Sequence, residues 1–253
     1  MILRLNYVKM LTYRADFFSS SIAYTVWATF TILQILLLTS RTSHVFGWSR
    51  DELLMLAAMY NLIFSFFYMF FSRGFNHFAT TIHLGRLDGI LTKPIDSQFL
   101  ITCLDVTYTH VIRFVLGLVF LMYLLFKVHI VITPLLILGL IFIGALSIML
   151  IYSFWMIVMT LTIWFPKVSN LTDLLYQVNQ ITKFPQEIYK GASIYLFFIL
   201  FPLTIIIVSP VKYLLHTLQW SDFLVLVVSS GGLFLFSRFF WRFALRSYTS
   251  ASS

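Results

Sequence analysis

Apolar stretches long enough to cross a bilayer recur along this chain and limit what it can fold into. A helix needs about 20 apolar residues to span the hydrocarbon core, and runs of that kind fill most of the 253 residues. Hydrophobic residues make up 60% of the chain and charged residues only 10%, whereas a soluble domain has about 25% charged residues. The sequence therefore predicts an all-α membrane protein, a single transmembrane domain over 1–253 with no room for a separate soluble domain.

Six membrane spans are expected within this domain. An amphipathic segment over 1–18, whose apolar residues recur close to helical spacing, is expected to lie as a helix in the membrane interface. The spans that follow cover about 20–39, 53–72, 104–126, 134–160, 164–185 and 222–241. Pro134 is a favourable residue for the first turn of a helix and fixes the start of the fourth span.

The segment 161–216 admits two topologies, because its first part is polar and its second part is interrupted by proline. In the first topology, 164–185 is a fifth span buried among other helices, and 186–216 is a re-entrant pair of short helices on the outer side. In the second, 161–190 is an inner loop and 192–210 is the fifth span. Both topologies give six spans and a cytoplasmic C-terminus.

Basic residues set the expected orientation. Arg238, Arg242 and Arg246 recur at one residue per helical turn at the end of the last span, and lysine and arginine are enriched on the cytoplasmic side of membranes. We therefore expect an integral protein of a bacterial cytoplasmic (inner) membrane, with both termini in the cytoplasm. The net charge of +8 is assigned to this orientation and to contact with membrane lipid, not to nucleic acid.

The longest polar interruption is the stretch 73–100, between the second and third spans. Its basic residues place it on the cytoplasmic side. Phe75, Phe78 and Ile82 are spaced as one face of a short helix. A short amphipathic helix in an inner loop suits docking to a soluble partner. We expect another protein to move the membrane part through this segment, which we call the coupling loop.

A polar stripe in the fifth expected span is the second candidate site. It consists of Asn170, Asp173, Gln177 and Gln180. Their spacings of 3, 4 and 3 place them on one helical face. If this helix crosses the membrane, a lipid-facing Asp173 would cost about 2.5–3.5 kcal/mol on insertion scales. The stripe would then line a substrate path or a dimer interface; the alternative is a solvated face of an inner loop.

Two neighbouring aromatic residues, Phe154 and Trp155, are further candidates for the substrate path, with an interfacial belt as the alternative. Enzymatic chemistry has no support, because the sequence holds no GxxxxGK[ST] phosphate loop and no paired carboxylates within a span. No two histidines have the i, i+4 spacing of a helical metal site. We expect no catalytic residue, metal or cofactor in this chain; if ATP drives it, ATP and Mg bind to another chain.

The coupling loop carries a family resemblance in the sequence LGRLDGILTKPIDSQF. It resembles the inner loop of permease subunits of ATP-binding-cassette (ABC) exporters, the ABC type-2 family, in particular a subgroup with the pattern G-x-L-D-x-x-L-x-x-P. In this chain the pattern consists of Gly85, Leu87, Asp88, Leu91 and Pro94. Three weaker matches lie along the chain in the order in which the family has them. They are Phe46-Gly47-Trp48-Ser49, Ser153-Phe154-Trp155 and Lys183-Phe184-Pro185.

The resemblance implies an interfacial N-terminal helix, six spans, a cytoplasmic coupling helix after the second span and a re-entrant outer segment before the sixth. It thereby favours the first topology. It also implies a dimer of permeases, identical or paralogous, seated on two copies of a separate ABC ATPase subunit. On this match, the ATPase-coupling residues are His77, His83, Gly85, Arg86, Leu87, Asp88, Leu91 and Pro94.

The function that the resemblance implies is that of the permease subunit of an ATP-driven ABC exporter. Such a subunit would move a lipid-like, drug-like or glycan substrate, with ATP hydrolysed by the partner. The rival interpretation is an ATP-independent secondary carrier or a membrane assembly scaffold. A carrier needs a coupling-ion site near mid-membrane, for which Asp173 is the candidate.

Overall fold

The computed structural model describes residues 14–42, 44–45, 47–103, 106–165, 170–191 and 194–248. Its α-helices are α2 (Arg14–Leu38), α3 (Arg50–Phe67), α4 (Arg73–His83), α5 (Leu87–Leu91), α6 (Ser97–Cys103), α7 (Val111–Lys127), α8 (Pro134–Thr160), α9 (Leu171–Ile181), α10 (Ile194–Leu214) and α11 (Trp220–Arg246). Shorter helical turns are η1 (Tyr68–Ser72), η2 (Tyr108–His110), η3 (Leu161–Ile163) and η4 (Gln186–Gly191). The strands β1 (His44–Val45) and β2 (Trp48–Ser49) pair antiparallel, with His44 opposite Ser49.

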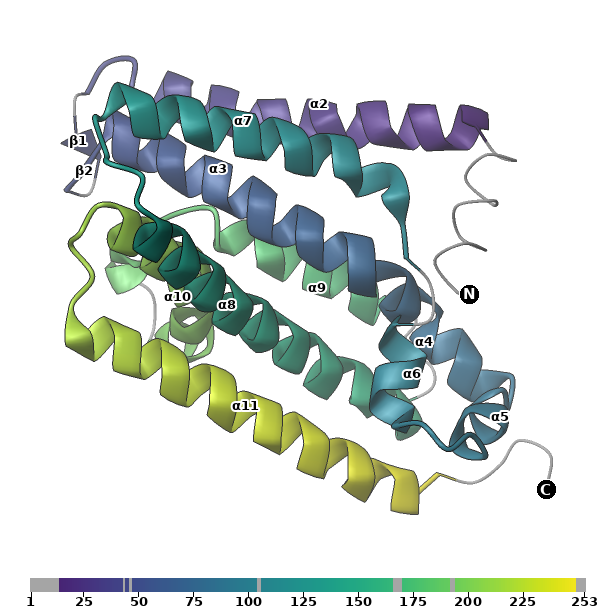
Figure 1. The fold of residues 1–253 in the computed structure, drawn as a ribbon. Helices are drawn as coiled ribbons and strands as arrows, with labels where there is room; N and C mark the ends of the chain where they lie inside the picture. Colours follow the sequence, from purple (N-terminus) through teal and green to yellow (C-terminus); the bar gives the residue numbers. More distant parts are fainter. Residues whose placement is uncertain are drawn as a thin grey trace.

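Five helices in the described residues are long and apolar enough to cross a membrane. They are the segments Arg14–Leu38, Arg50–Ile82, Tyr108–Lys127, Pro134–Ile163 and Trp220–Arg246. Figure 1 shows them running side by side, with α2, α7 and α3 above α8 and α11. The predicted fold class, an all-α membrane protein, is therefore confirmed.

The second of these segments is a continuous rod through the middle of the bundle. A capping box starts it: the Ser49 N–H donates to the Glu52 carboxylate over 2.7 Å, and the Ser49 hydroxyl accepts from the Glu52 N–H. The rod runs through α3, the π-turn η1 and α4 without a break. Most of its residues are buried, whereas no more than about a third of the residues are buried in each of the other four segments. An apolar helix of this kind is expected at the centre of a bundle.

Part of the expected coupling loop is therefore an extension of the second span. Phe75, Phe78 and Ile82 are buried on one face of α4, which confirms the helical face predicted for them. The third span begins as a helix at Tyr108, later than the expected residue 104. Just before it, Thr107 has extended backbone, and its N–H donates to the Met69 carbonyl in η1 over 2.8 Å.

The other expected boundaries agree in part with the helices. The expected fourth span, 134–160, coincides with α8, which Thr133 caps and Pro134 begins. The first long helix begins at Arg14, inside the segment 1–18 expected to be interfacial, and residues 1–13 lie outside the described part of the chain.

The segment 161–216 contains two separate helices in its described residues. At 11 residues, α9 is about 16 Å long, too short to cross a membrane by itself. The 21-residue α10 holds Pro202 and Pro210 inside the helix. Its second half lies along the first half of α8, because Ser147 donates to the Ile206 carbonyl over 2.8 Å and Tyr213 donates to the Leu135 carbonyl over 3.3 Å.

Candidate functional site

The short helices α4, α5 and α6 form the first part of the candidate site. Figure 1 shows them together at the end of the bundle where α11 finishes. At Gly74, α4 meets α6 backbone to backbone: a Cβ atom built there would overlap the carbonyl group of Thr102. Gly85 follows α4 with a φ of 66°, in the left-handed region that glycine adopts most readily. Two glycines thus set the shape of the coupling loop.

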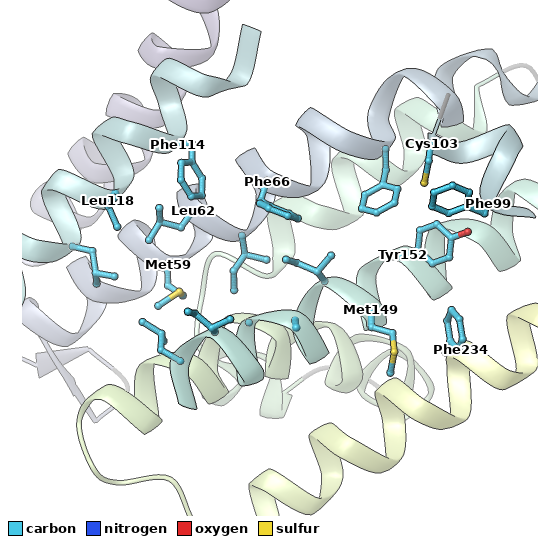
Figure 2. Close-up of a pocket in the computed structure, with 18 of the residues that line it drawn as sticks. Met59, Leu62, Phe66, Phe99, Cys103, Phe114, Leu118, Met149, Tyr152 and Phe234 are labelled. Carbon is cyan, nitrogen blue, oxygen red and sulfur yellow. The ribbon is translucent and has the colours of Figure 1, made fainter. Parts of the chain in front are cut away.

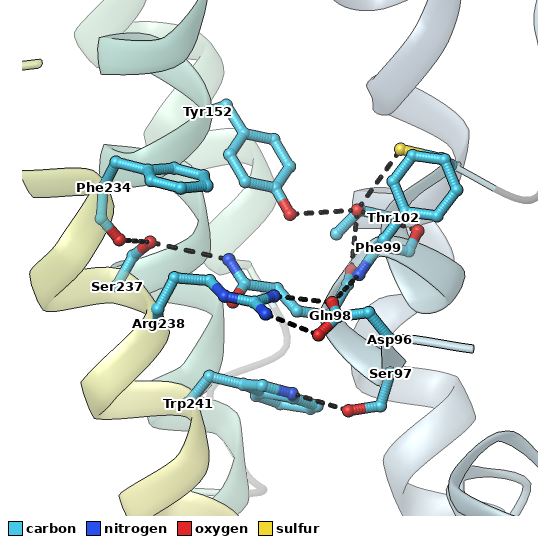
Figure 3. A network of polar contacts seen from close by, with 11 residues as sticks. Asp96, Ser97, Gln98, Phe99, Thr102, Tyr152, Phe234, Ser237, Arg238 and Trp241 are labelled. Atoms are coloured by element: carbon cyan, nitrogen blue, oxygen red, sulfur yellow. Dashed lines mark hydrogen bonds and ion pairs between the residues drawn. The ribbon is translucent and has the colours of Figure 1, made fainter. Parts of the chain in front are cut away.

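An ion pair joins this loop to the last helix. Both carboxylate oxygens of Asp96 accept hydrogen bonds from the two terminal nitrogens of Arg238, each over 2.6 Å (Figure 3). Asp96 also accepts the N–H of Phe99 over 2.9 Å in the first turn of α6. The Arg238 hydrogen bonds hold the pKa of Asp96 below its usual value. The geometry is bidentate, which fixes orientation as well as distance.

Two further contacts in Figure 3 connect the same elements. The Trp241 indole N–H donates to the Ser97 hydroxyl over 3.1 Å, and the Gln98 amide donates to Ser237 over 3.5 Å. Trp241 and Gln98 are buried. The start of α6 is therefore held to α11 at several points along one side.

The predicted ATPase-coupling residues divide into exposed and buried groups. His77, Arg86, Leu91 and Pro94 are exposed at the end of the bundle. Gly85 and Asp88 are half-buried. Leu87 is fully buried, so it anchors α5 and is not available for contact with a partner. His83 ends α4.

Exposed apolar side chains add to the surface of this loop. Leu84 is 61% exposed and Ile95 is 53% exposed, beside Leu91 at 41%. Sequence reasoning did not single out Leu84 and Ile95. Their signal was present in the sequence, because each is an apolar residue within a polar loop next to the glycine and proline that shape it. The exposed face thus combines the apolar residues Leu84, Leu91 and Ile95 with the basic residue Arg86.

The polar stripe lies on α9 and in the residue before it. Asn170, Asp173 and Gln177 are exposed and Gln180 is half-buried, whereas Leu175 on the opposite side is fully buried. The stripe therefore faces away from the other helices of this chain.

Trp155 is a core residue in this structure, and its neighbour Phe154 is half-buried. The Trp155 indole N–H donates to the Asn179 side-chain oxygen over 3.3 Å, and the Asn179 amide donates to the Tyr68 hydroxyl over 3.0 Å. This chain of hydrogen bonds ties α8 to α9 and to the central rod. Sequence reasoning missed Asn179; its signal was a polar residue out of phase with the exposed stripe.

The contacts of the segment 171–187 follow the central rod from α4 to α3 and end at β2. In order they are Tyr176 with Asn76, Asn179 with Tyr68, Lys183 with Tyr60 and Glu187 with Trp48. The segment therefore runs antiparallel to α4 and α3. Its last contact is beside the β-hairpin, at the opposite end of the bundle from the coupling loop.

An apolar groove of about 640 Å³ lies on another side of the rod (Figure 2). Side chains of α3, α6, α7, α8 and α11 line it, among them Phe66, Phe114 and Met149. Gln98 and Arg238 give it a polar end next to α6. The outward faces of α7 and α8 carry exposed apolar residues such as Val119 and Leu138. A groove between such faces is suited to a lipid acyl chain.

These features define a class: a polytopic helical membrane protein whose short helices are fixed to its long ones at one end. The chain belongs to the ABC-2 family transporter proteins, whose family profile matches residues 25–252. Comparison with curated proteins and with solved structures gave no match. Family membership makes this chain the membrane component of a transporter, not itself catalytic, and it implies an ABC ATPase partner in general.

Proposed function

We propose that this chain is the membrane-spanning permease subunit of an ATP-driven ABC exporter, with ATP and Mg bound and hydrolysed by a separate ATPase subunit. One observation carries the proposal: the coupling loop exposes Leu91 and Arg86, while Asp96, on the same loop, is fixed to Arg238 of the last helix. A loop of this kind offers a contact surface and a mechanical connection together.

The mechanism follows from these connections. Closure of the ATPase dimer would displace the coupling loop, and two routes lead from it into the membrane. One is the unbroken rod Arg50–Ile82, and the other is α11, joined through Asp96 and Trp241. Rigid helices that tilt as bodies convert a displacement at one end into a change of access at the other. Coupling of this kind requires that both sites bias the same two-state element.

The assembly we propose contains two permeases, identical or paralogous, and two ATPase subunits, in a bacterial cytoplasmic membrane with both termini in the cytoplasm. The exposed residues His77, Arg86, Leu91, Lys93 and Pro94 would contact the ATPase. Membrane lipid would cover the apolar faces of the long helices, and the groove of Figure 2 would hold acyl chains.

For the topology, we propose that 164–185 crosses the membrane against the central rod and that 186–216 re-enters from the outer side. The ordered contacts from Asn76 to Trp48 support a crossing. The antiparallel contact of the second half of α10 with the first half of α8 supports a segment that enters and returns. Labelling of a cysteine placed at Lys190 from the outer side tests this arrangement; labelling from the inner side only would contradict it.

The substrate would be lipid-like, drug-like or a glycan. We propose that the stripe of Asn170, Asp173, Gln177 and Gln180 lines its path or the interface with the second permease. The exposed placement of Asp173 and Gln177 supports this role, since a polar face turned away from its own bundle needs water or a partner.

The test is purification of the tagged chain in a mild detergent, followed by mass spectrometry of the retained proteins. An ABC ATPase is the expected partner, and Leu91→Asp is expected to reduce its recovery about tenfold, as for loss of an interface contact worth about 1.4 kcal/mol. Val131→Asp is the matched control, because Val131 is an exposed apolar residue in the loop between α7 and α8. Recovery of the chain without any ATPase would favour the carrier or scaffold instead.

A further inference from the structure

Two buried cationic side chains face the same aromatic ring inside the bundle. The Arg113 guanidinium lies 5.7 Å from the centroid of the Tyr60 ring, and the Lys183 ammonium lies 5.4 Å from it. The exposed fractions of Arg113 and Lys183 are only 7% and 8%, and Tyr60 is 1% exposed. The three residues come from α7, from the turn after α9 and from the central rod. The site therefore forms where three separate segments meet.

A neutral residue holds one of the two cations in place. Arg113 donates from Nε to the Asn61 side-chain oxygen over 2.9 Å, and the Asn61 amide donates to the Ala57 carbonyl over 3.0 Å. This hydrogen bond holds the guanidinium through its inner nitrogen, and the Tyr60 side chain is a second polar neighbour. Among the described residues, no recorded hydrogen bond joins its two terminal nitrogens to a carboxylate, the kind of group that this pair of donors grips.

The described carboxylates with recorded ion pairs are paired with cations other than Arg113 and Lys183. Asp51 pairs with Lys127, Asp222 pairs with Lys212, and Asp96 pairs with Arg238. Glu187, four residues after Lys183, accepts a hydrogen bond from Trp48. Within the described part of the chain, no ion pair joins a carboxylate to Arg113 or to Lys183.

Two like charges in a bundle core are unfavourable without a counter-charge, because the low dielectric strengthens their repulsion and removes their hydration. Charged residues within membrane segments characteristically pair with opposite charge or mark a ligand pathway. An aromatic ring offsets a cation only in part. A negatively charged group beside Tyr60 would offset part of this positive charge, and it would also bridge α7 to the segment that follows α9.

We propose that Arg113 and Lys183, which both lie beside the Tyr60 ring, bind the anionic group of an amphipathic substrate, a phosphate or a carboxylate. This inference rests on the proposed transport function and narrows its substrate class to anionic amphiphiles. Arginine supplies a planar pair of donors and lysine a compact charge, the combination that recognises such groups. Lys183 also lies directly after the helix that carries the polar stripe, so the anion site continues the proposed path.

The experiment measures thermal unfolding of the full chain in a neutral detergent during titration with three compounds. They are dioleoylphosphatidylglycerol, dioleoylphosphatidylcholine and inorganic phosphate. The anionic lipid is expected to raise the unfolding temperature with saturation, and the zwitterionic lipid is not. Stabilisation by inorganic phosphate as well would identify a site for small anions, whereas a response to the lipid alone would identify an amphiphile.

Substitutions at the two cations test whether the stabilisation by the anionic lipid comes from this site. Arg113→Gln and Lys183→Gln are each expected to raise the half-saturating concentration of the anionic lipid roughly tenfold or more, the effect of losing a hydrogen bond to a charged group. Lys183→Arg keeps the charge and is expected to keep the response, which separates loss of binding from loss of folding. Arg242→Gln is the control for general attraction to anionic headgroups, because Arg242 is an exposed residue at the end of α11.

An equal response in the wild-type chain, Arg113→Gln and Lys183→Gln would overturn the site, and so would equal stabilisation by both lipids. Recovery of an ABC ATPase with the same variants is measured in parallel. If the ATPase is retained while the anionic lipid has no effect on the wild-type chain, this inference fails and the proposed function stands.

Discussion

The Ser147 hydroxyl donates a hydrogen bond over 2.8 Å to the carbonyl oxygen of Ile206, the acceptor that Pro210 leaves without its helical donor. In an α-helix the N–H of residue 210 would bond to the carbonyl of residue 206, and proline has no N–H. Ser147 is fully buried in α8, and Ile206 is buried in α10. A side chain of one helix therefore supplies the hydrogen bond that another helix lacks, in a region where water cannot do so.

Ser147→Ala is expected to destabilise the protein by roughly 1–3 kcal/mol, because it leaves a buried carbonyl without a donor. The measurement is thermal or denaturant-induced unfolding of the chain in detergent. Ser153→Ala is the matched control: Ser153 is equally buried on α8, but its hydroxyl donates to Met149 of its own helix. Equal losses in the two variants would show that the bond to Ile206 has no special role.

Gly74→Ala is expected to separate α4 from α6, because the added Cβ would overlap the Thr102 backbone and backbone cannot move aside cheaply. Overpacking of this kind costs about 1–3 kcal/mol. The variant should unfold at lower temperature and retain less ATPase. Gly89→Ala in α5 is the comparison, since no atom lies within 4 Å of a Cβ at that position. If the two variants behave alike, close contact at Gly74 does not shape the coupling loop.

Asp96→Asn tests the connection between the coupling loop and α11. The hydrogen bonds from Arg238 lower the pKa of Asp96 from its usual 3.8, so the ion pair contributes stability above pH 3.8 that is lost as the pH falls through the lowered pKa. Asp96 is partly exposed, so the contribution is about 1 kcal/mol or less.

The difference in unfolding temperature between wild type and Asp96→Asn should therefore be constant from pH 5 to pH 7. It should begin to shrink below about pH 4, the ordinary range of an aspartate. A difference that grew in acid would contradict the assignment of the ion pair.

Asn179→Ala is expected to leave the Trp155 N–H and the Tyr68 hydroxyl without their partner in the core. The expected loss of unfolding free energy is again roughly 1–3 kcal/mol. Gln177→Ala, on the exposed side of the same helix, should change stability by no more than about 0.5 kcal/mol. A larger effect of Gln177 than of Asn179 would mean that the stripe, not Asn179, holds α9 in place.

Much of the fold could be predicted from apolar runs and helix starts. The bounds of α8 follow from Pro134 and from the length of its apolar run, and the buried face of α4 follows from the spacing of Phe75, Phe78 and Ile82. The division of 161–216 could not be predicted. Pro202 and Pro210 argue against a continuous helix, yet α10 contains both, and at Pro210 the hydrogen bond from Ser147 of a distant helix compensates for the missing donor.

The candidate site was predictable only where the signal is local. The coupling loop stands out by its polarity and its glycines, but the sequence does not show which residues face outward; Leu87 is buried although it belongs to the family-like pattern. The pair of Asp96 and Arg238 spans 142 residues and leaves no local trace. The position of Trp155 was ambiguous for a different reason: α8 is apolar around most of its circumference, so periodicity cannot tell its core face from its outer face.

The most direct test of the central claim is photo-crosslinking in intact membranes from a reactive amino acid placed at Leu91 or at Val131. Both positions are exposed, one in the coupling loop and one in the loop between α7 and α8. The account predicts an adduct with an ABC ATPase from position 91 and none from position 131. An ATPase adduct from neither position, or equal adducts from both, would contradict it.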